Sequence, residues 1–137
     1  MKDESDPVSP DEFILRRIPN LPSYIKELPI SVARAAFSPT DDDVDGVSVY
    51  REHFVTAKDV AEAGRSDMGY YVVRFKAEDL FNLGVSLVPN KQEDGLPGHT
   101  LIPELSLISK TQDKKKYKEL ALKITKLASN DIAFRPV

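Results

Sequence analysis

Apolar residues recur along the chain in short runs, and their spacing predicts the secondary structure of each run. Alternation or a short β-branched run predicts strands at 13–18, 47–50, 69–76 and 85–88, with a further extended piece at 99–102. Steps of three and four residues predict short helices at 20–28, 56–63 and 77–83 and a long helix at 112–128. The run 30–37 fits both patterns, because its alanines favour a helix and its β-branched residues favour a strand.

Residues that stop helices and form turns set the ends of these elements. Pro19 ends the first strand, Thr56 is positioned to cap a helix, and Gly84 stands where a helix needs a left-handed residue. The segment 39–46 is predicted to be a loop. We therefore expect an α+β fold: a small mixed or mainly antiparallel sheet with two or three short helices and one long C-terminal amphipathic helix.

The composition predicts one domain preceded by a tail. Residues 1–11 contain four acids and a single Val8, so they are predicted to form a disordered acidic tail ahead of a single domain at 12–137. With 137 residues, of which 41% are hydrophobic, the chain can form a core without disulfides. The absence of cysteine excludes thiol nucleophiles and cysteine-ligated metal sites.

The charge balance limits the classes of partner. A formal net charge of -3 argues against a general nucleic-acid binder, which needs basic residues to neutralise phosphates. The charged start lacks the apolar region of a secretory signal, and no stretch approaches the length of a membrane span. We expect a cytoplasmic protein with no membrane association.

The charges are unevenly distributed, which suggests a surface for a protein partner. Acids are concentrated before Asp59, whereas lysines crowd the predicted C-terminal helix. The candidate partner-binding residues are Lys114, Lys115, Lys118 and Lys123. No arginine is interleaved, and the one aromatic residue there, Tyr117, belongs to the apolar stripe of the helix, so nucleic acid is not an expected partner. The alternative interpretation is a lysine-rich face that is merely solvated.

One segment fits the spacing of an EF-hand calcium loop. Its oxygen ligands would come from Asp41, Asp43, Asp45 and Glu52, with Gly46 at the sharp turn. The context disagrees, because Pro39 precedes the loop and a predicted strand follows it. We favour an acidic surface turn with no metal and keep calcium binding as an alternative.

Four residues are candidates for chemistry or ligand contact. Arg16 and Arg17 point to opposite faces of a predicted strand, so one of them should face inward and need a carboxylate or an anionic ligand. Ser48 could line the same cleft. His99, after Gly98, is a candidate general base, although a structural hydrogen bond to a loop is the simpler role.

Several short motifs resemble other proteins. The pieces Leu15-Arg-Arg-Ile-Pro19, Asp45-Gly-Val-Ser-Val-Tyr-Arg51 and Pro97-Gly-His-Thr-Leu-Ile102 resemble a pattern in small uncharacterised bacterial proteins that have no known activity. The opening of the chain also resembles ADP-ribosyltransferase-like domains. That resemblance implies an NAD site using Arg16 or Arg17, Ser48 and a glutamate, for which Glu104 is the available residue.

These observations favour a small partner-binding accessory or regulatory protein, as in a bacterial defence or toxin locus, with no cofactor. The alternatives are an ADP-ribosyltransferase-like enzyme that uses NAD and a calcium-binding protein.

Overall fold

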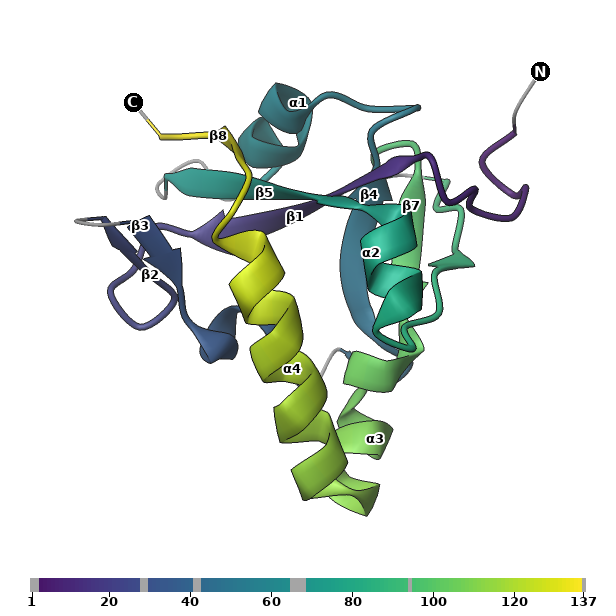
Figure 1. The fold of residues 1–137 in the computed structure, drawn as a ribbon. Helices are drawn as coiled ribbons and strands as arrows, with labels where there is room; N and C mark the ends of the chain where they lie inside the picture. The colour runs from purple at the N-terminus through teal and green to yellow at the C-terminus, as the bar shows by residue number, and fades with distance from the viewer. Residues whose placement is uncertain (1–2, 28–29, 41–42, 65–68, 94, 137) are drawn as a thin grey trace.

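Six strands form an antiparallel sheet at the centre of the molecule, in the order β6–β7–β4–β1–β5–β8 (Figure 1). The structure is a computed structural model that describes residues 3–27, 30–40, 43–64, 69–93 and 95–136. The strands of the sheet are β1 (Phe13–Pro19), β4 (Val47–Arg51), β5 (Tyr70–Lys76), β6 (Val88–Pro89), β7 (His99–Ile102) and β8 (Ile132–Phe134). A separate pair joins β2 (Ile25–Glu27) to β3 (Ile30–Val32).

Three short helices and one long helix accompany the sheet, which confirms the predicted α+β class. They are α1 (Ala57–Glu62), α2 (Ala77–Asn82), α3 (Leu107–Gln112) and α4 (Lys114–Ala128), and two 3-10 turns, η1 (Arg34–Phe37) and η2 (Pro103–Leu105), complete the set. The Thr56 hydroxyl accepts a hydrogen bond from Asp59 N and caps α1, and Gly84 has the left-handed φ of 86° expected after α2. No described helix is both long enough and apolar enough to span a membrane.

Helices pack on both faces of the sheet. On one face, α4 buries Tyr117, Ala121 and Ile124 in a large core with β1, β4, β5 and β7. On the other face, α1 places Val60 against Leu15 and Val72 (Figure 1). Because both faces are covered over β1, successive residues of that strand are buried in two different cores.

The predicted helix at 20–28 is wrong. Leu21 to Tyr24 form one turn, and residues 25–27 then pair with β3. This pairing buries Ile25 and Val32 side by side in the main core, and Ser129 at the end of α4 accepts a hydrogen bond from Val32 N. A nine-residue segment with an internal proline gains more from that packing than from helical hydrogen bonds.

Three further differences between the predicted and observed elements concern where the elements begin and end. The ambiguous run 30–37 contains both structures, since β3 is followed directly by η1. Only Val88 of the predicted strand 85–88 is in a strand, because Ser86 is bonded to the Glu104 carboxylate instead. The predicted helix at 112–128 starts at Lys114, where Asp113 caps it, and α3 precedes it.

The N-terminal segment 3–11, predicted from composition to be a tail, lies against the domain. Its backbone carbonyls accept hydrogen bonds from the buried Arg51, and Val8 is buried in the main core. The chain then enters β1, which occupies an interior position of the sheet.

Candidate functional site

Ser48 and His99 form a hydrogen-bonded pair across two neighbouring strands. The pairing of β4 with β7 sets Tyr50 opposite His99, and His99 Nε2 lies 2.8 Å from Ser48 Oγ. His99 Nδ1 lies 2.9 Å from the backbone oxygen of Asn90 and 3.1 Å from its side-chain oxygen. A carbonyl oxygen only accepts hydrogen bonds, so Nδ1 carries the proton of the neutral ring and Nε2 accepts from the serine.

The two arginines of β1 lie on opposite faces, and both are half-buried. Arg16 donates from Nη1 to Ser48 O at 2.7 Å and from Nη2 to Ala36 O at 2.9 Å, whereas its buried Nε has no hydrogen-bond partner in the described part of the chain. Arg17 donates to Val60 O at 2.9 Å on the α1 face. Burial lowers the pKa of the Arg16 guanidinium, and the nearby Asp43 carboxylate partly offsets this effect.

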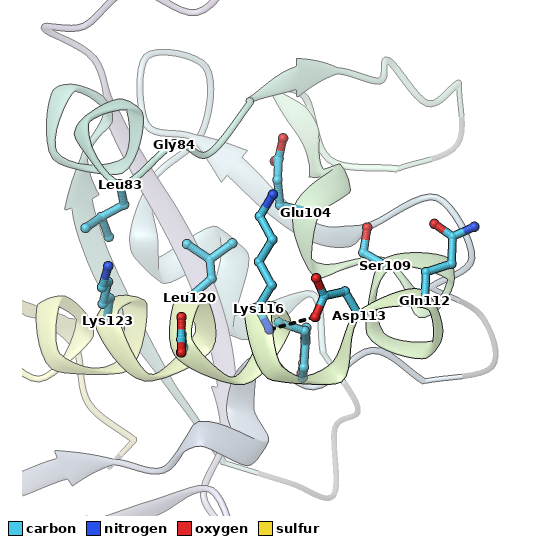
Figure 2. A pocket seen from close by; sticks show the side chains of 11 residues that line it. Leu83, Gly84, Glu104, Ser109, Gln112, Asp113, Lys116, Leu120 and Lys123 are labelled. Atoms are coloured by element: carbon cyan, nitrogen blue, oxygen red, sulfur yellow. Dashed lines mark hydrogen bonds between the residues drawn. The ribbon is translucent and has the colours of Figure 1, made fainter.

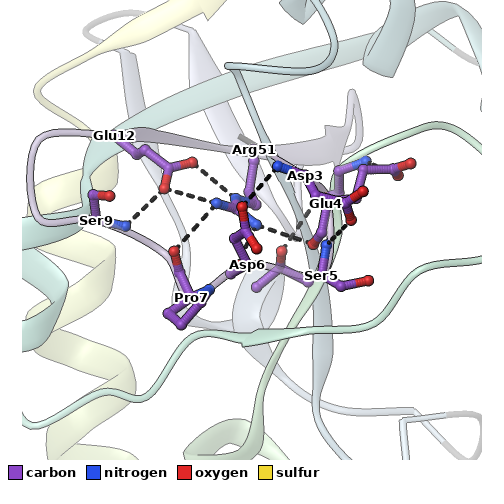
Figure 3. Close-up of polar contacts among 10 residues, drawn as sticks. Asp3, Glu4, Ser5, Asp6, Pro7, Ser9, Glu12 and Arg51 are labelled. Atoms are coloured by element: carbon purple, nitrogen blue, oxygen red, sulfur yellow. Dashed lines mark hydrogen bonds and ion pairs between the residues drawn. The ribbon is translucent and has the colours of Figure 1, made fainter. Parts of the chain in front are cut away.

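A third arginine, which sequence reasoning missed, is fully buried. Arg51 forms a two-pronged ion pair with Glu12, with Nε–Oε1 and Nη2–Oε2 distances of 2.8 Å. Its Nη1 also donates to the backbone oxygens of Glu4 and Asp6, and Gly98 N donates to the Glu4 carboxylate (Figure 3). A sequence signal existed, because Arg51 continues the alternation of Val47 and Val49 on the buried face.

A groove of about 600 Å³ opens between α4, α3 and the end of α2. Its lining residues are Leu83, Gly84, Glu104, Ser109, Gln112, Asp113, Lys116, Tyr117, Glu119, Leu120 and Lys123. Figure 2 shows Lys116, Leu120 and Lys123 projecting from α4 toward Leu83 and Gly84 at the end of α2 and toward Glu104 on η2. A Cβ on Gly84 would meet no atom within 4 Å, so the groove is open at this point.

Some charged side chains of the groove have partners within the protein and others do not. Glu104 accepts hydrogen bonds from Ser86 N and Oγ, both at 2.8 Å, and Asp113 accepts one from Lys116 N. In the part of the chain that the structure describes, neither Lys116 nor Lys123 is in an ion pair. The groove therefore combines apolar side chains with two ammonium groups that have no ion-pair partner among the described residues.

The candidate residues from the sequence fall into two separate places. Ser48 and His99 contact each other on the α1 face, whereas Arg16 reaches only the Ser48 backbone, from the α4 face, and Arg17 contacts Val60 O on the α1 face. Glu104 lines the groove and is held by Ser86. Of the proposed partner-binding lysines, Lys123 lines the groove, and Lys114, Lys115 and Lys118 are exposed on α4.

The described members of the acidic motif do not gather around one point. Asp43 accepts hydrogen bonds from Thr40, Asp45 is exposed, and Glu52 lies beyond β4, where it pairs with Arg74. An extended strand rises about 3.3 Å per residue, so β4 keeps Asp45 and Glu52 apart. Asp41 lies outside the described residues. Among those that are described, no group of three or more potential metal ligands occurs.

In comparisons with known proteins, no protein-family model, no curated protein and no solved structure matches the chain.

Proposed function

We propose that the protein is a binding module that holds an acidic segment of a protein partner in the groove between α4, α3 and α2. The observation that carries this proposal is the pair of lysines, Lys116 and Lys123, that face the groove without an ion-pair partner in the described part of the chain.

The apolar lining supports a peptide rather than a small anion as the occupant. Leu83, Tyr117 and Leu120 line the groove between the charged groups, and Tyr117 is buried there with its hydroxyl donating to Phe37 O. Hydrophobic anchors surrounded by charges are the usual arrangement of a groove that takes an amphipathic helix. A volume of about 600 Å³ accommodates several side chains.

The charges beside the groove determine the sign of the partner. Lys114, Lys115 and Lys118 are exposed on the same helix and add to the positive field. Two of the three carboxylates in the lining are already engaged inside the protein, Glu104 by Ser86 and Asp113 by the start of α4. An acidic partner would thus be attracted to the lysines, and complementary charge raises the rate of association.

The test is fluorescence anisotropy with a designed, labelled amphipathic peptide that has leucines on one helical face and glutamates on the other. Wild-type protein should bind this peptide and reject the same peptide with lysines in place of glutamates. Lys123→Glu should weaken binding by about tenfold, equivalent to about 1.4 kcal/mol.

The matched control is Lys58→Glu, which reverses an exposed charge on α1, away from the groove. This variant should bind as the wild type does. Equal affinity for both peptides, no binding of either, or an equal loss in the two variants would refute the proposal.

The ADP-ribosyltransferase alternative receives less support from the site. The resemblance needs a glutamate beside the arginine and serine, and Glu104 is committed to Ser86 in the groove. That the protein belongs to a bacterial defence or toxin locus stays a prediction from the sequence.

A further inference from the structure

We propose that Ser48 is a nucleophile and His99 its general base, and that this pair hydrolyses small carboxylic esters. The proposal concerns the face of the sheet that carries α1, so it is independent of the groove. Its foundation is the chain of contacts from Ser48 Oγ to His99 Nε2 and from His99 Nδ1 to Asn90.

The geometry of this chain is that of an activated serine. A general base must lie within hydrogen-bonding distance of the proton that it removes, and the 2.8 Å between Oγ and Nε2 meets that condition. The base must also be held in the right tautomer by a third group. Asn90 does this with its backbone and side-chain oxygens, which makes it a positioning residue.

The surroundings hold the pair in place. His99 is buried, and its ring packs edge-on against Tyr50 at a centroid distance of 5.5 Å. The Ser48 backbone is fixed from the other face by the hydrogen bond from Arg16. These contacts restrain both reacting groups before a substrate arrives, which lowers the entropic cost of reaching the transition state.

Substrate can reach the serine from the surface of the sheet. The register pairs Ser48 with Leu101 and Leu101 with Val88, so these three side chains share one face. Ser48 and Leu101 are half-buried and Val88 is 44% exposed. An apolar acyl group could therefore lie on Leu101 and Val88 beside the hydroxyl.

The reaction proceeds in two steps. Ser48 Oγ forms a bond to the carbonyl carbon of the ester while its proton moves to His99 Nε2. The bond from that carbon to the alcohol oxygen then breaks, and the alcohol leaves with the proton from His99. Water then attacks the carbonyl carbon of the acyl-serine and gives a proton to His99, the bond from that carbon to Ser48 Oγ breaks, Oγ takes the proton back from His99, and the carboxylic acid is released.

The test uses the full chain and a fluorophosphonate probe. Ser48 Oγ would form a bond to phosphorus as the phosphorus–fluorine bond breaks, releasing fluoride, and His99 would take the hydroxyl proton. We expect one adduct by intact mass, located on Ser48 by peptide sequencing. Ser48→Ala should not react, and His99→Gln should react about 100-fold more slowly.

Controls separate this role from a structural one. Ser31→Ala, which removes an exposed serine on β3, should react as the wild type does, and circular dichroism should confirm that each variant is folded. In Asn90→Ala, which removes the side-chain acceptor and keeps the backbone one, ¹⁵N NMR of the His99 ring should show a smaller share of the Nδ1–H tautomer, with slower labelling. Turnover of p-nitrophenyl acetate should be lost in Ser48→Ala.

The absence of a Ser48 adduct on the wild-type protein would overturn the proposal, and this result requires no variant to fold. Equal labelling rates for wild type and a folded His99→Gln would also overturn it. In either case the pair would be only a cross-strand hydrogen bond.

Discussion

Two arginines on neighbouring strands have buried guanidinium groups, and these are accommodated in opposite ways. Arg51 is matched by the Glu12 carboxylate and by backbone oxygens of the N-terminal segment. Among the described residues, Arg16 donates to the backbone oxygens of Ser48 and Ala36 and its Nε finds no hydrogen-bond partner. Both donate hydrogen bonds while buried, but only the first has its charge neutralised by direct contact.

The difference indicates separate roles for the two regions. At Arg51 the ion pair holds together residues 39 positions apart in the sequence and ties the start of the chain to the sheet. At Arg16 the guanidinium fixes the backbone of a residue whose side chain contacts His99. Three substitutions and one truncation, in order of decreasing expected loss of stability, test this account of the charged residues.

Glu12→Gln should have the largest effect. It leaves the fully buried Arg51 charge without its counterion, and removing one partner of a buried ion pair costs about 3–5 kcal/mol. Urea denaturation followed by circular dichroism measures the loss. Glu93→Gln, at an exposed position, is the control and should have almost no effect. A loss below about 1 kcal/mol for Glu12→Gln would contradict this account of the pair.

Removal of residues 1–7 should reduce the free energy of unfolding by about 2 kcal/mol, because Arg51 loses several hydrogen-bond acceptors while Glu12 remains. The same denaturation experiment measures it. Hydrogen exchange at Gly98 should also become faster, since Gly98 N donates to the Glu4 carboxylate. Unchanged stability and unchanged exchange would show that residues 1–7 do not contribute to the fold.

Arg16→Met should cost less, about 1–2 kcal/mol. Two backbone oxygens lose their donors, but the penalty for burying an uncompensated charge disappears. Thermal and urea denaturation would measure this, with Arg34→Met on the exposed side of η1 as the control. A loss as large as that of Glu12→Gln would remove the distinction between the two arginines.

Asp131→Asn should have the smallest effect, below about 1 kcal/mol, because it weakens an ion pair of Arg74 that is more than a third exposed. The Asp131 hydrogen bond raises the pKa of Arg74, but solvent screens the interaction. A double-mutant cycle with Arg74→Met measures the coupling, which should shrink further at high salt. A coupling free energy that is large and does not change with salt would contradict this prediction.

The local sequence pattern was sufficient to predict those elements whose apolar spacing matches their burial in the structure. The strands at Phe13–Pro19 and Tyr70–Lys76 and the helix capped by Thr56 follow directly from alternation and capping. The 20–28 segment failed because its apolar spacing suits a helix, whereas tertiary pairing with β3 decides the outcome. Spacing alone could not reveal that competing contact.

Individual residues of the candidate site could be predicted from the sequence, but their arrangement could not. Ser48 and His99 were candidates from the sequence, yet their hydrogen bond depends on the register of β4 against β7, which brings together residues 51 positions apart. The ion pair of Arg51 with Glu12 likewise joins residues that lie far apart in the sequence. The groove required the packing of α3 against α4, and α3 has no strong apolar periodicity.

The two outer strands of the sheet, β6 and β8, limit how other chains can associate with this protein. β6 has two residues, one of them Pro89, and β8 has three, with an irregular register against β5. Short, interrupted edges offer few backbone groups to an added strand, which protects against edge-to-edge aggregation. Association by extending this sheet is therefore disfavoured, and recognition of the partner that we propose would depend on side chains.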